Sequence, residues 1–166
     1  MDNKGITIIE LILILAIMGI IVVIAVPKFD FSDSEMKRYG RELVMDLNHI
    51  KTKSKISDQN RNNRIFLKSN SYDLFIDDKI NKTKKLKEKF KITTTIPSGS
   101  IKEIYFSRMG APKHACSIFI INNENNRYIK ISITVATGRI HMYEDVRVGY
   151  NENIKNEMET NEWHHD

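Results

Sequence analysis

The chain has 166 residues, of which 41% are hydrophobic and 28% charged, with a formal net charge of +5 at pH 7. This length allows one soluble domain of about 110 to 120 residues beside one long apolar segment. Cys116 is the only cysteine, which excludes an internal disulfide. The five histidines lack a zinc-binding spacing, and no serine or cysteine sits in a recognisable nucleophile motif. We therefore expect no catalytic site, no cofactor and no metal site.

A long apolar segment lies close to the amino terminus. It runs from Ile6 to Val26 and follows a short polar leader, residues 1–5. At about 1.5 Å of rise per helical residue, the segment can cross a hydrocarbon layer about 30 Å thick. No Ala-x-Ala-like cleavage site follows it, which argues against a removable secretory signal. We predict one retained membrane helix over residues 6–26, whose orientation the flanking charges do not fix.

Glu10 is the single ionisable residue within this apolar segment. A carboxylate in a membrane helix costs about 2.5 to 3.5 kcal/mol on insertion scales, so it usually has a partner or a function. The alternative is a polar residue one turn into the helix that reaches the lipid headgroups. The surrounding residues bear on this choice.

These surrounding residues form a pattern of leader, scissile glycine and aliphatic helix. It consists of Lys4-Gly5, then Ile6-Thr7-Ile8-Ile9-Glu10-Leu11, an aliphatic run with Ala16 and Gly19, and Ala25-Val26-Pro27. The pattern resembles the class III signal of type IV pilins and pseudopilins. In that family a membrane peptidase cuts after the glycine and methylates the new amino terminus. The resemblance implies cleavage between Gly5 and Ile6, methylation of Ile6 and leader recognition through Lys4; the family most often has phenylalanine where this chain has Ile6.

The same resemblance implies how the subunit assembles. The new ammonium group at Ile6 of one subunit would pair with Glu10 of a neighbour, because an unpaired charge in apolar surroundings is costly. Pro27 would bend or loosen the helix, as proline removes one helical hydrogen bond. The implied partners are other pilins or pseudopilins, a prepilin peptidase, an inner-membrane assembly platform and membrane lipid. The head would lie outside the cytoplasm, in a periplasmic or extracellular filament after assembly.

Beyond Pro27 the sequence predicts an amphipathic helix that continues into a soluble head. Asp33 or Ser34 could cap a restart, but the resemblance favours one bent helix over residues 27–60. Its apolar stripe has helical spacing and should pack on a sheet; it consists of Met36, Tyr39, Leu43, Leu47, Ile50 and Ser54.

From residue 61 to 143 the apolar period changes to two, which predicts strands. The expected strands are 64–67, 72–76, 90–96, 101–107, 117–121, 128–135 and 140–143, the first two forming a hairpin. Gly110 and Gly138 should supply positive-φ turns, and Cys116 should be a small buried residue at a strand start. We predict an α+β pilin fold in which the long N-terminal helix packs against an antiparallel sheet, followed by a polar, flexible tail over 144–166.

Several segments of the head refine the resemblance. Residues 43–58 precede a strand, and Ile104-Tyr105-Phe106-Ser107-Arg108-Met109-Gly110, Ser117-Ile118-Phe119-Ile120, Ile131-Ser132-Ile133 and Thr137-Gly138-Arg139-Ile140 follow. This order is similar to that of minor pseudopilins of the type II secretion H and FimT-like group.

Lysines crowd one predicted loop, which contains Lys82, Lys84, Lys85, Lys87 and Lys89. Such a run is either a solvated, flexible connector or a patch for a polyanion such as DNA. Only Phe90 is interleaved with these lysines, which gives little support to recognition of single-stranded nucleic acid.

Three functions compete on these observations. The first is a minor pilin or pseudopilin, a structural subunit of a type IV pilus or a type II secretion-like filament. The second is a competence pseudopilin that assists DNA uptake, for which the lysine-rich loop is the supporting feature. The third is a membrane-anchored binding or sensor domain outside any filament. In each of them the chain is a substrate or a component and not an enzyme.

Overall fold

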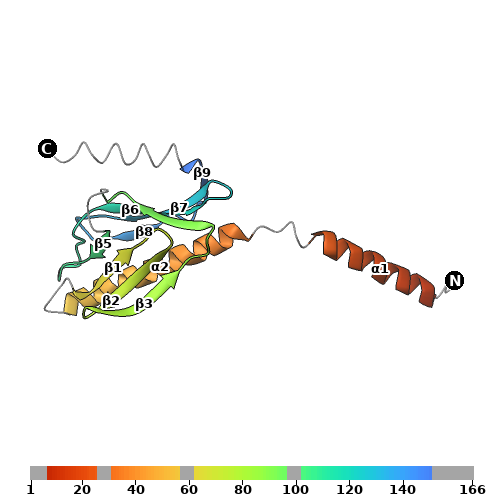
Figure 1. Ribbon diagram of the computed structural model, residues 1–166, viewed down its shortest axis with the longest axis horizontal. Coiled ribbons are helices and arrows are strands. Elements are labelled where there is room, and N and C mark those ends of the chain that lie inside the picture. Colours follow the sequence, from red (N-terminus) through yellow and green to blue (C-terminus); the bar gives the residue numbers. More distant parts are fainter. Residues whose placement is uncertain (1–6, 26–30, 57–61, 97–101, 151–166) are drawn as a thin grey trace, which may run out of the picture. The chain divides into compact units, whose positions relative to one another are not determined.

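The computed structural model describes residues 7–25, 31–56, 62–96 and 102–150. The chain divides into two compact units, Met1–Phe31 and Ser32–Asp166. The first contains helix α1 (Ile8–Ala25), and the second contains helix α2 (Ser32–Ile56) and every strand that the structure describes (Figure 1).

Helix α1 starts where its sequence provides a cap. The backbone N–H of Glu10 donates a hydrogen bond to Thr7 Oγ1 at 3.3 Å, and the N–H of Leu11 donates to the Thr7 carbonyl at 3.1 Å. A threonine followed three residues later by a glutamate is the spacing of a capping box. Glu10 thus lies in the first turn of α1, where a carboxylate is also favoured by the helix dipole.

Across the described residues, no helix combines the length and the apolar character required to cross a membrane. Both ends of the predicted membrane helix, residues 6 and 26, lie outside the described residues. Pro27 does as well, so the bend there stays a prediction. The structure gives two helices, one ending at Ala25 and the next beginning at Ser32, in place of a single described helix over residues 27–60.

Helix α2 buries the predicted stripe. All six of its members are buried: Met36, Tyr39, Leu43, Leu47, Ile50 and Ser54. Gly40 lies on the same face and allows a close approach to the sheet, because an added Cβ would stand 2.5 Å from Ile129 Cδ1. Helical periodicity therefore identified the core face of this element correctly.

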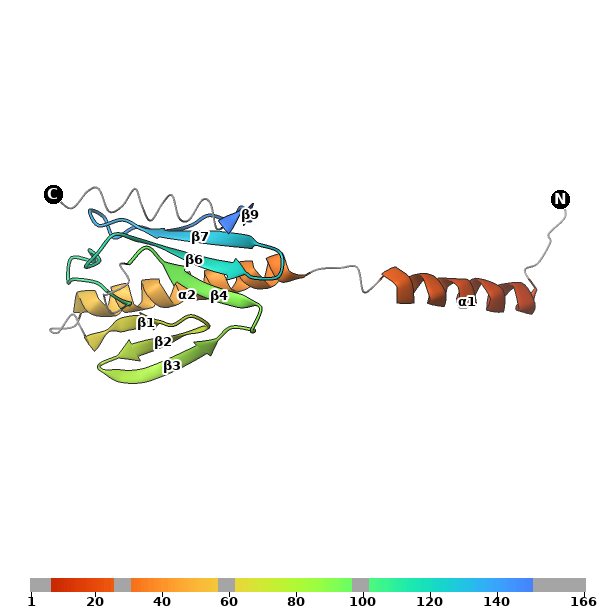
Figure 2. The same cartoon turned by 45° about the horizontal axis from the view of Figure 1, so that its top comes forward.

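The strands form two antiparallel sheets, which corrects the prediction of a single sheet. The four-stranded sheet has the order β3-β2-β1-β5, with β1 (Arg64–Leu67), β2 (Ser71–Ile76), β3 (Lys79–Lys85) and β5 (Glu103–Tyr105). The five-stranded sheet has the order β4-β6-β7-β8 with β9 also on β7, and contains β4 (Phe90–Thr94), β6 (Cys116–Asn122), β7 (Arg127–Ile133), β8 (Ile140–Met142) and β9 (Arg147–Val148). Helix α2 contacts both sheets, and Figure 2 shows them one above the other along this helix.

The physical reason for the split is the pairing of β4. This strand pairs with β6 and not with its sequence neighbour β3, so the ladder breaks between the two. Both inner faces still meet α2, because Ile65 and Leu74 from one sheet join Ile118 and Ile129 from the other in one buried cluster. The apolar face of α2 thus packs against both sheets.

Two strands fall where the sequence predicted none, the seven-residue β3 and the two-residue β9. Strand β3 lies in the lysine-rich segment that was predicted to be a loop, and it pairs with β2 across a turn at Asp77 and Asp78, whose φ angles are 51° and 62°. Two successive positive φ angles are typical of a tight hairpin turn. Strand β9 lies inside the tail predicted to be flexible from residue 144, and Arg147 pairs with Tyr128 of β7.

Three local predictions are confirmed. Gly110 and Gly138 have positive φ angles of 79° and 57°. Cys116 is buried at the first position of β6, and this burial raises the pKa of its thiol to about 12. A thiol with such a pKa stays protonated at neutral pH, which suits a packing role.

Candidate assembly site

Helix α1 presents apolar side chains on all sides. Every large apolar residue from Ile8 to Val22 is exposed, from 44% at Ile14 to 80% at Ile8. A helix that is apolar all round is normally covered by other helices or by lipid. Within the first unit, no other described element covers the apolar side chains of α1.

Glu10 is the acidic residue in the first turn of this helix, and it is exposed. Among the residues that the structure describes, its carboxylate has no ion-pair partner and accepts no hydrogen bond from a side chain. Covering the helix by apolar neighbours would remove water from this carboxylate, which is costly unless a cation joins it. Burial of α1 would therefore favour either a cation beside Glu10 or protonation of its carboxylate.

Lys4, Gly5 and Ile6 lie outside the described residues, as does Pro27. Cleavage after Gly5, methylation of Ile6, the role of Lys4 in the leader and the bend at Pro27 remain predictions from sequence.

The lysines of β3 are brought against carboxylates of α2. Lys82 Nζ lies 2.8 Å from Asp46 Oδ2 and 2.9 Å from Glu42 Oε1, and Lys84 Nζ lies 2.6 Å from Glu42 Oε2. Tyr72 donates its hydroxyl hydrogen bond to Asp46 Oδ2 at 2.6 Å. These contacts place two lysine charges, two carboxylates and a buried phenol in one network between strand and helix.

The pKa directions agree with this geometry. Partial burial opposes the charged forms of Glu42 and Lys82. At Glu42, hydrogen bonds from Lys84 and Lys82 outweigh this burial and lower the pKa, and at Lys82, hydrogen bonds to Asp46 and Glu42 outweigh it and raise the pKa. Burial, together with the hydrogen bond to Asp46, raises the pKa of Tyr72. Glu42 and Lys82 thus remain charged at neutral pH.

A second pair of lysines, Lys87 and Lys89, contacts side chains in the first turn of α2. Lys87 forms a hydrogen-bonded ion pair with Glu35, and Lys89 lies 3.5 Å from the other oxygen of this carboxylate. Lys89 also donates to Ser32 Oγ at 2.7 Å. The hydrogen bond from Lys87 is the main reason that the pKa of Glu35 is lowered.

Four of the five lysines proposed for a polyanion patch, Lys82, Lys84, Lys87 and Lys89, therefore pair with carboxylates of α2. Lys85 is exposed and has no ion-pair partner within the described ranges. Sequence reasoning missed Glu35, Glu42 and Asp46, although they recur seven and then four residues apart, a spacing that puts them on one side of a helix. DNA binding is not tested by these contacts.

Among the described residues, no group of three histidine, cysteine, aspartate or glutamate side chains could hold a metal ion. His164 and His165, the adjacent pair in the tail, lie outside those residues.

No protein-family model and no curated protein matches this sequence. Among solved structures, the chain is similar to the minor pseudopilin EpsH from the type 2 secretion system of Vibrio cholerae, with a TM-score of 0.50 and 10% sequence identity. The similarity covers 66% of this chain and 96% of EpsH. At so low an identity the likeness concerns the fold and does not separate the H and FimT-like group from other pseudopilins. The chain therefore has the α+β fold of a pseudopilin, with a long helix packed against antiparallel sheets.

Proposed function

We propose that this protein is a minor pilin or pseudopilin, a structural subunit of a type IV pilus or a type II secretion-like filament. The observation that carries the proposal is a helix with exposed apolar side chains on every side, a single carboxylate in its first turn, and a head with a pseudopilin fold. Such a helix gains free energy when copies bury it together, since burial yields about 25 cal/mol per Å² of apolar surface.

In this proposal the chain is made as a precursor and processed before assembly. A prepilin peptidase recognises the leader at Lys4, cuts between Gly5 and Ile6 and methylates the new amino terminus. Until assembly, the apolar helix holds the subunit in the cytoplasmic membrane, where lipid covers its side chains. An inner-membrane platform then moves it into the filament.

Pairing between neighbours would set the register of the filament. The ammonium group at Ile6 of one subunit neutralises Glu10 of the next, and a subunit inserted at the wrong depth leaves both charges unpaired. Removing one partner of a buried ion pair typically costs about 3 to 5 kcal/mol, which is enough to select one depth. The cap formed by Thr7 supports this role, because it fixes the turn that carries Glu10.

The test is a substitution that removes the charge and keeps the shape. Glu10→Gln should leave the amount of subunit in the membrane unchanged but reduce its incorporation into filaments at least about tenfold, because the paired amine would lose its counterion. Incorporation is measured in sheared filament fractions by immunoblotting. Glu144→Gln, which neutralises an exposed carboxylate of the head, is the matched control and should assemble normally.

The two alternatives make different predictions for the same variants. A membrane-anchored domain outside any filament should tolerate Glu10→Gln, because a lone anchor inserts more easily without the charge. A competence pseudopilin would still depend on Glu10 and would differ in binding DNA. The ion pairs of β3 provide the lysines with a role inside the head, so no specific contact favours DNA uptake over the filament function.

A further inference from the structure

Helix α2 exposes one stripe of side chains along most of its length. These side chains recur alternately four and three residues apart, which places them on one side of a helix. The buried stripe that packs on the two sheets lies on the other side. We call the exposed set the outer stripe, and all of its members are exposed: Ser34, Arg38, Arg41, Met45, Asn48, Thr52 and Lys55.

The charges of α2 are segregated around the helix. Each of its four acidic residues forms an ion pair with a basic side chain from outside the helix, and none of the four belongs to the outer stripe; they are Asp33, Glu35, Glu42 and Asp46. The ionisable members of the outer stripe are Arg38, Arg41 and Lys55. Within the described ranges these three form no ion pair, although Arg38 reaches over the ring of Tyr39 at 5.1 Å from its centroid. The outer stripe is therefore basic and is not neutralised by the acidic residues of its own helix.

Exposed apolar side chains accompany these basic residues. Met45, in the middle of the outer stripe, is 71% exposed, and Ile56, next to Lys55, is 80% exposed. From Arg38 to Lys55 the helix extends over about 25 Å. Basic and apolar side chains together on one helix face are typical of surfaces that lie on a membrane. Nucleic-acid phosphates could also attract the cations, but a phosphate backbone offers no apolar layer for Met45 and Ile56.

The order of the chain favours a membrane as the partner. Helix α1, which is apolar throughout, ends at Ala25, and α2 begins at Ser32. Seven residue steps extend over no more than about 25 Å, whatever path the chain takes. When α1 is in a bilayer, the outer stripe is therefore tethered near the lipid surface, and a tethered site meets its ligand at high effective concentration.

We propose that the outer stripe binds the headgroups of anionic phospholipids while α1 holds the subunit in the membrane. Arg38, Arg41 and Lys55 contact lipid phosphates, and Met45 enters the boundary between headgroups and acyl chains. Each basic residue at an anionic membrane surface favours binding about fivefold, so the three together shift the ratio of docked to undocked heads about a hundredfold. The contact keeps the head at the membrane until the subunit enters a filament. This inference rests on the proposed function in that α1 lies in a membrane.

The access of water to the outer stripe tests the contact. The full chain with Met45→Cys, labelled with a fluorophore, is reconstituted in vesicles of phosphatidylcholine with or without phosphatidylglycerol. Quenching by acrylamide, which is neutral and water-soluble, should be about threefold weaker in the anionic vesicles. It should recover in 1 M salt, where the Debye length is about 3 Å. Cys116 can stay in place because its thiol is buried.

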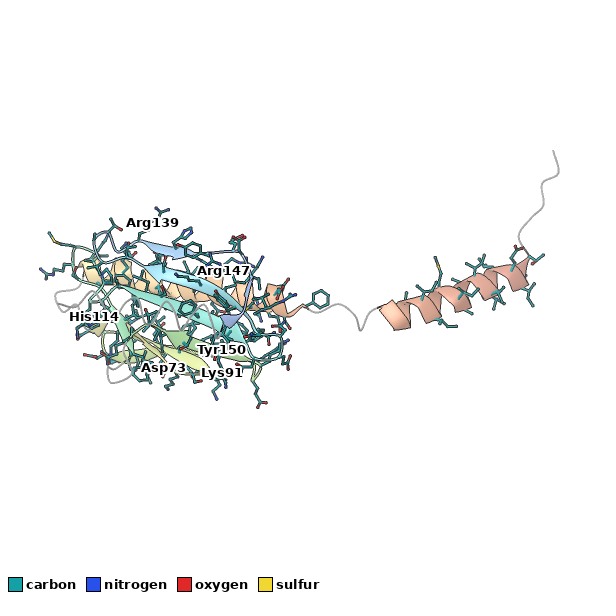
Figure 3. The ribbon with its side chains drawn as sticks, turned by 90° about the horizontal axis from the view of Figure 1, so that it is seen from above. Asp73, Lys91, His114, Arg139, Arg147 and Tyr150 are labelled. Atoms are coloured by element: carbon teal, nitrogen blue, oxygen red, sulfur yellow. The ribbon has the colours of Figure 1, made fainter. Side chains whose placement is uncertain are left out.

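A label at Lys91→Cys is the control for position. Lys91 is exposed and alternates along β4 with the buried Phe90 and Ile92, so it points away from the core that contains α2. Figure 3 labels Lys91 on the side of the head where strands lie in front of α2. Quenching at this position should be the same in both kinds of vesicle.

Charge substitutions test the role of the three cations. Quenching at position 45 should become equal in the two lipids when the cations of the outer stripe are removed by Arg38→Gln, Arg41→Gln and Lys55→Gln. The matched control removes three exposed lysines elsewhere on the head and should preserve the difference: Lys79→Gln, Lys85→Gln and Lys102→Gln.

Three results would overturn the proposal. The first is equal quenching at position 45 of the otherwise unchanged chain in both lipids, and the second is protection that survives the loss of the three cations. The third is protection that occurs in both lipids and increases with the amount of protein, which would assign the outer stripe to a second copy of the chain.

Flotation of the same vesicles separates this inference from the proposed function. A chain that floats with both kinds of vesicle is anchored by α1, so a lack of lipid-dependent protection then counts against the outer stripe alone. A chain that floats only with anionic vesicles, and loses this binding with the three cations, supports the outer stripe and contradicts the anchoring by α1. A chain that floats with neither contradicts both.

Discussion

At Gly138 the backbone leaves no room for a side chain. An added Cβ would stand 1.9 Å from the carbonyl oxygen of Gly110, and the φ angle of 57° is unfavourable for other residues. Lys51 of α2 donates a hydrogen bond to the Gly138 carbonyl at 2.7 Å. Two turns far apart in sequence are thus held together at the end of α2.

Gly138→Ala should therefore lower the free energy of unfolding by about 3 kcal/mol, because backbone strain and a clash with main-chain atoms add together. Gly110→Ala is the matched comparison. It has a similar positive φ of 79°, but an added Cβ meets only the flexible ends of Lys51 and Lys55, so its cost should be about 1 to 2 kcal/mol. Urea denaturation of both variants measures the difference; equal costs would contradict the close contact between the turns.

The lowered pKa of Glu42, in the network on α2, should make stability depend on pH. The pKa of Glu42 is lowered below its ordinary value of 4.5, so the folded chain binds fewer protons than the unfolded chain in acid. The stabilisation is present above pH 4.5 and is lost as the pH falls through the lower, folded pKa.

Glu42→Gln should remove about 1 kcal/mol of stability at pH 7 and flatten the fall in stability below pH 4.5. Denaturation midpoints between pH 7 and pH 3 provide the measurement. Glu88→Gln, at an exposed position, should leave both the stability and its pH profile as they are. An unchanged acid profile in Glu42→Gln would mean that the ion pairs with Lys82 and Lys84 do not persist in solution.

At the scale of elements, the lysine-rich segment is a strand tied to a helix. Its charges hold β3 and the residues after it against α2, since Lys82 and Lys84 pair with Glu42 and Lys87 pairs with Glu35. Strand β3 has little apolar surface to keep it in the sheet, so these pairs substitute for side-chain packing.

Lys82→Met with Lys84→Met should destabilise the head by about 2 kcal/mol, because Glu42 and Asp46 lose their lysine partners and Asp46 keeps only the hydrogen bond from Tyr72. The same variant should leave any weak binding to double-stranded DNA almost unchanged, because carboxylates of α2 already neutralise these two lysines. Lys79→Met with Lys85→Met, which removes two exposed lysines, is the control and should not affect stability. If only the first variant loses affinity for DNA, and its stability is unchanged, Lys82 and Lys84 bind DNA and do not act as structural ion-pair partners.

The sequence predicted those elements whose apolar residues follow one period. The stripe of α2 and the strands that contain Ile65, Leu74, Ile118 and Ile131 were identified because burial on one face imposes the spacing. Strand β3 was missed because its side chains are mostly exposed, and the second sheet was missed because spacing does not say which strands pair. Ion pairs between α2 and β3 join residues far apart in sequence and follow only from the fold.

Of the candidate site, the sequence placed Glu10 at the start of a helix, and the structure adds its cap at Thr7. Processing at Lys4, Gly5 and Ile6 stays a prediction because these residues lie outside the described ranges. Pairing of Glu10 with an amine is a property of two chains in contact and does not follow from one chain alone.

On the scale of the whole molecule, two kinds of surface are combined. The first unit contains a helix whose apolar side chains are exposed throughout, and the second is a head with its own core and a pseudopilin fold. The head buries its own apolar side chains, whereas the apolar side chains of α1 stay exposed in this chain. This combination of an apolar helix and a head with its own core agrees with the proposed filament function.

The most direct test of the account is mass spectrometry of the amino terminus of the protein isolated from its native host. In the proposed assembly, processing must come first, because it creates the amine at Ile6 that pairs with Glu10 of a neighbour. We predict a mature chain that begins at Ile6 and is heavier than the unmodified chain by one methyl group. A chain that still begins at Met1 in assembled, functional material would contradict the account.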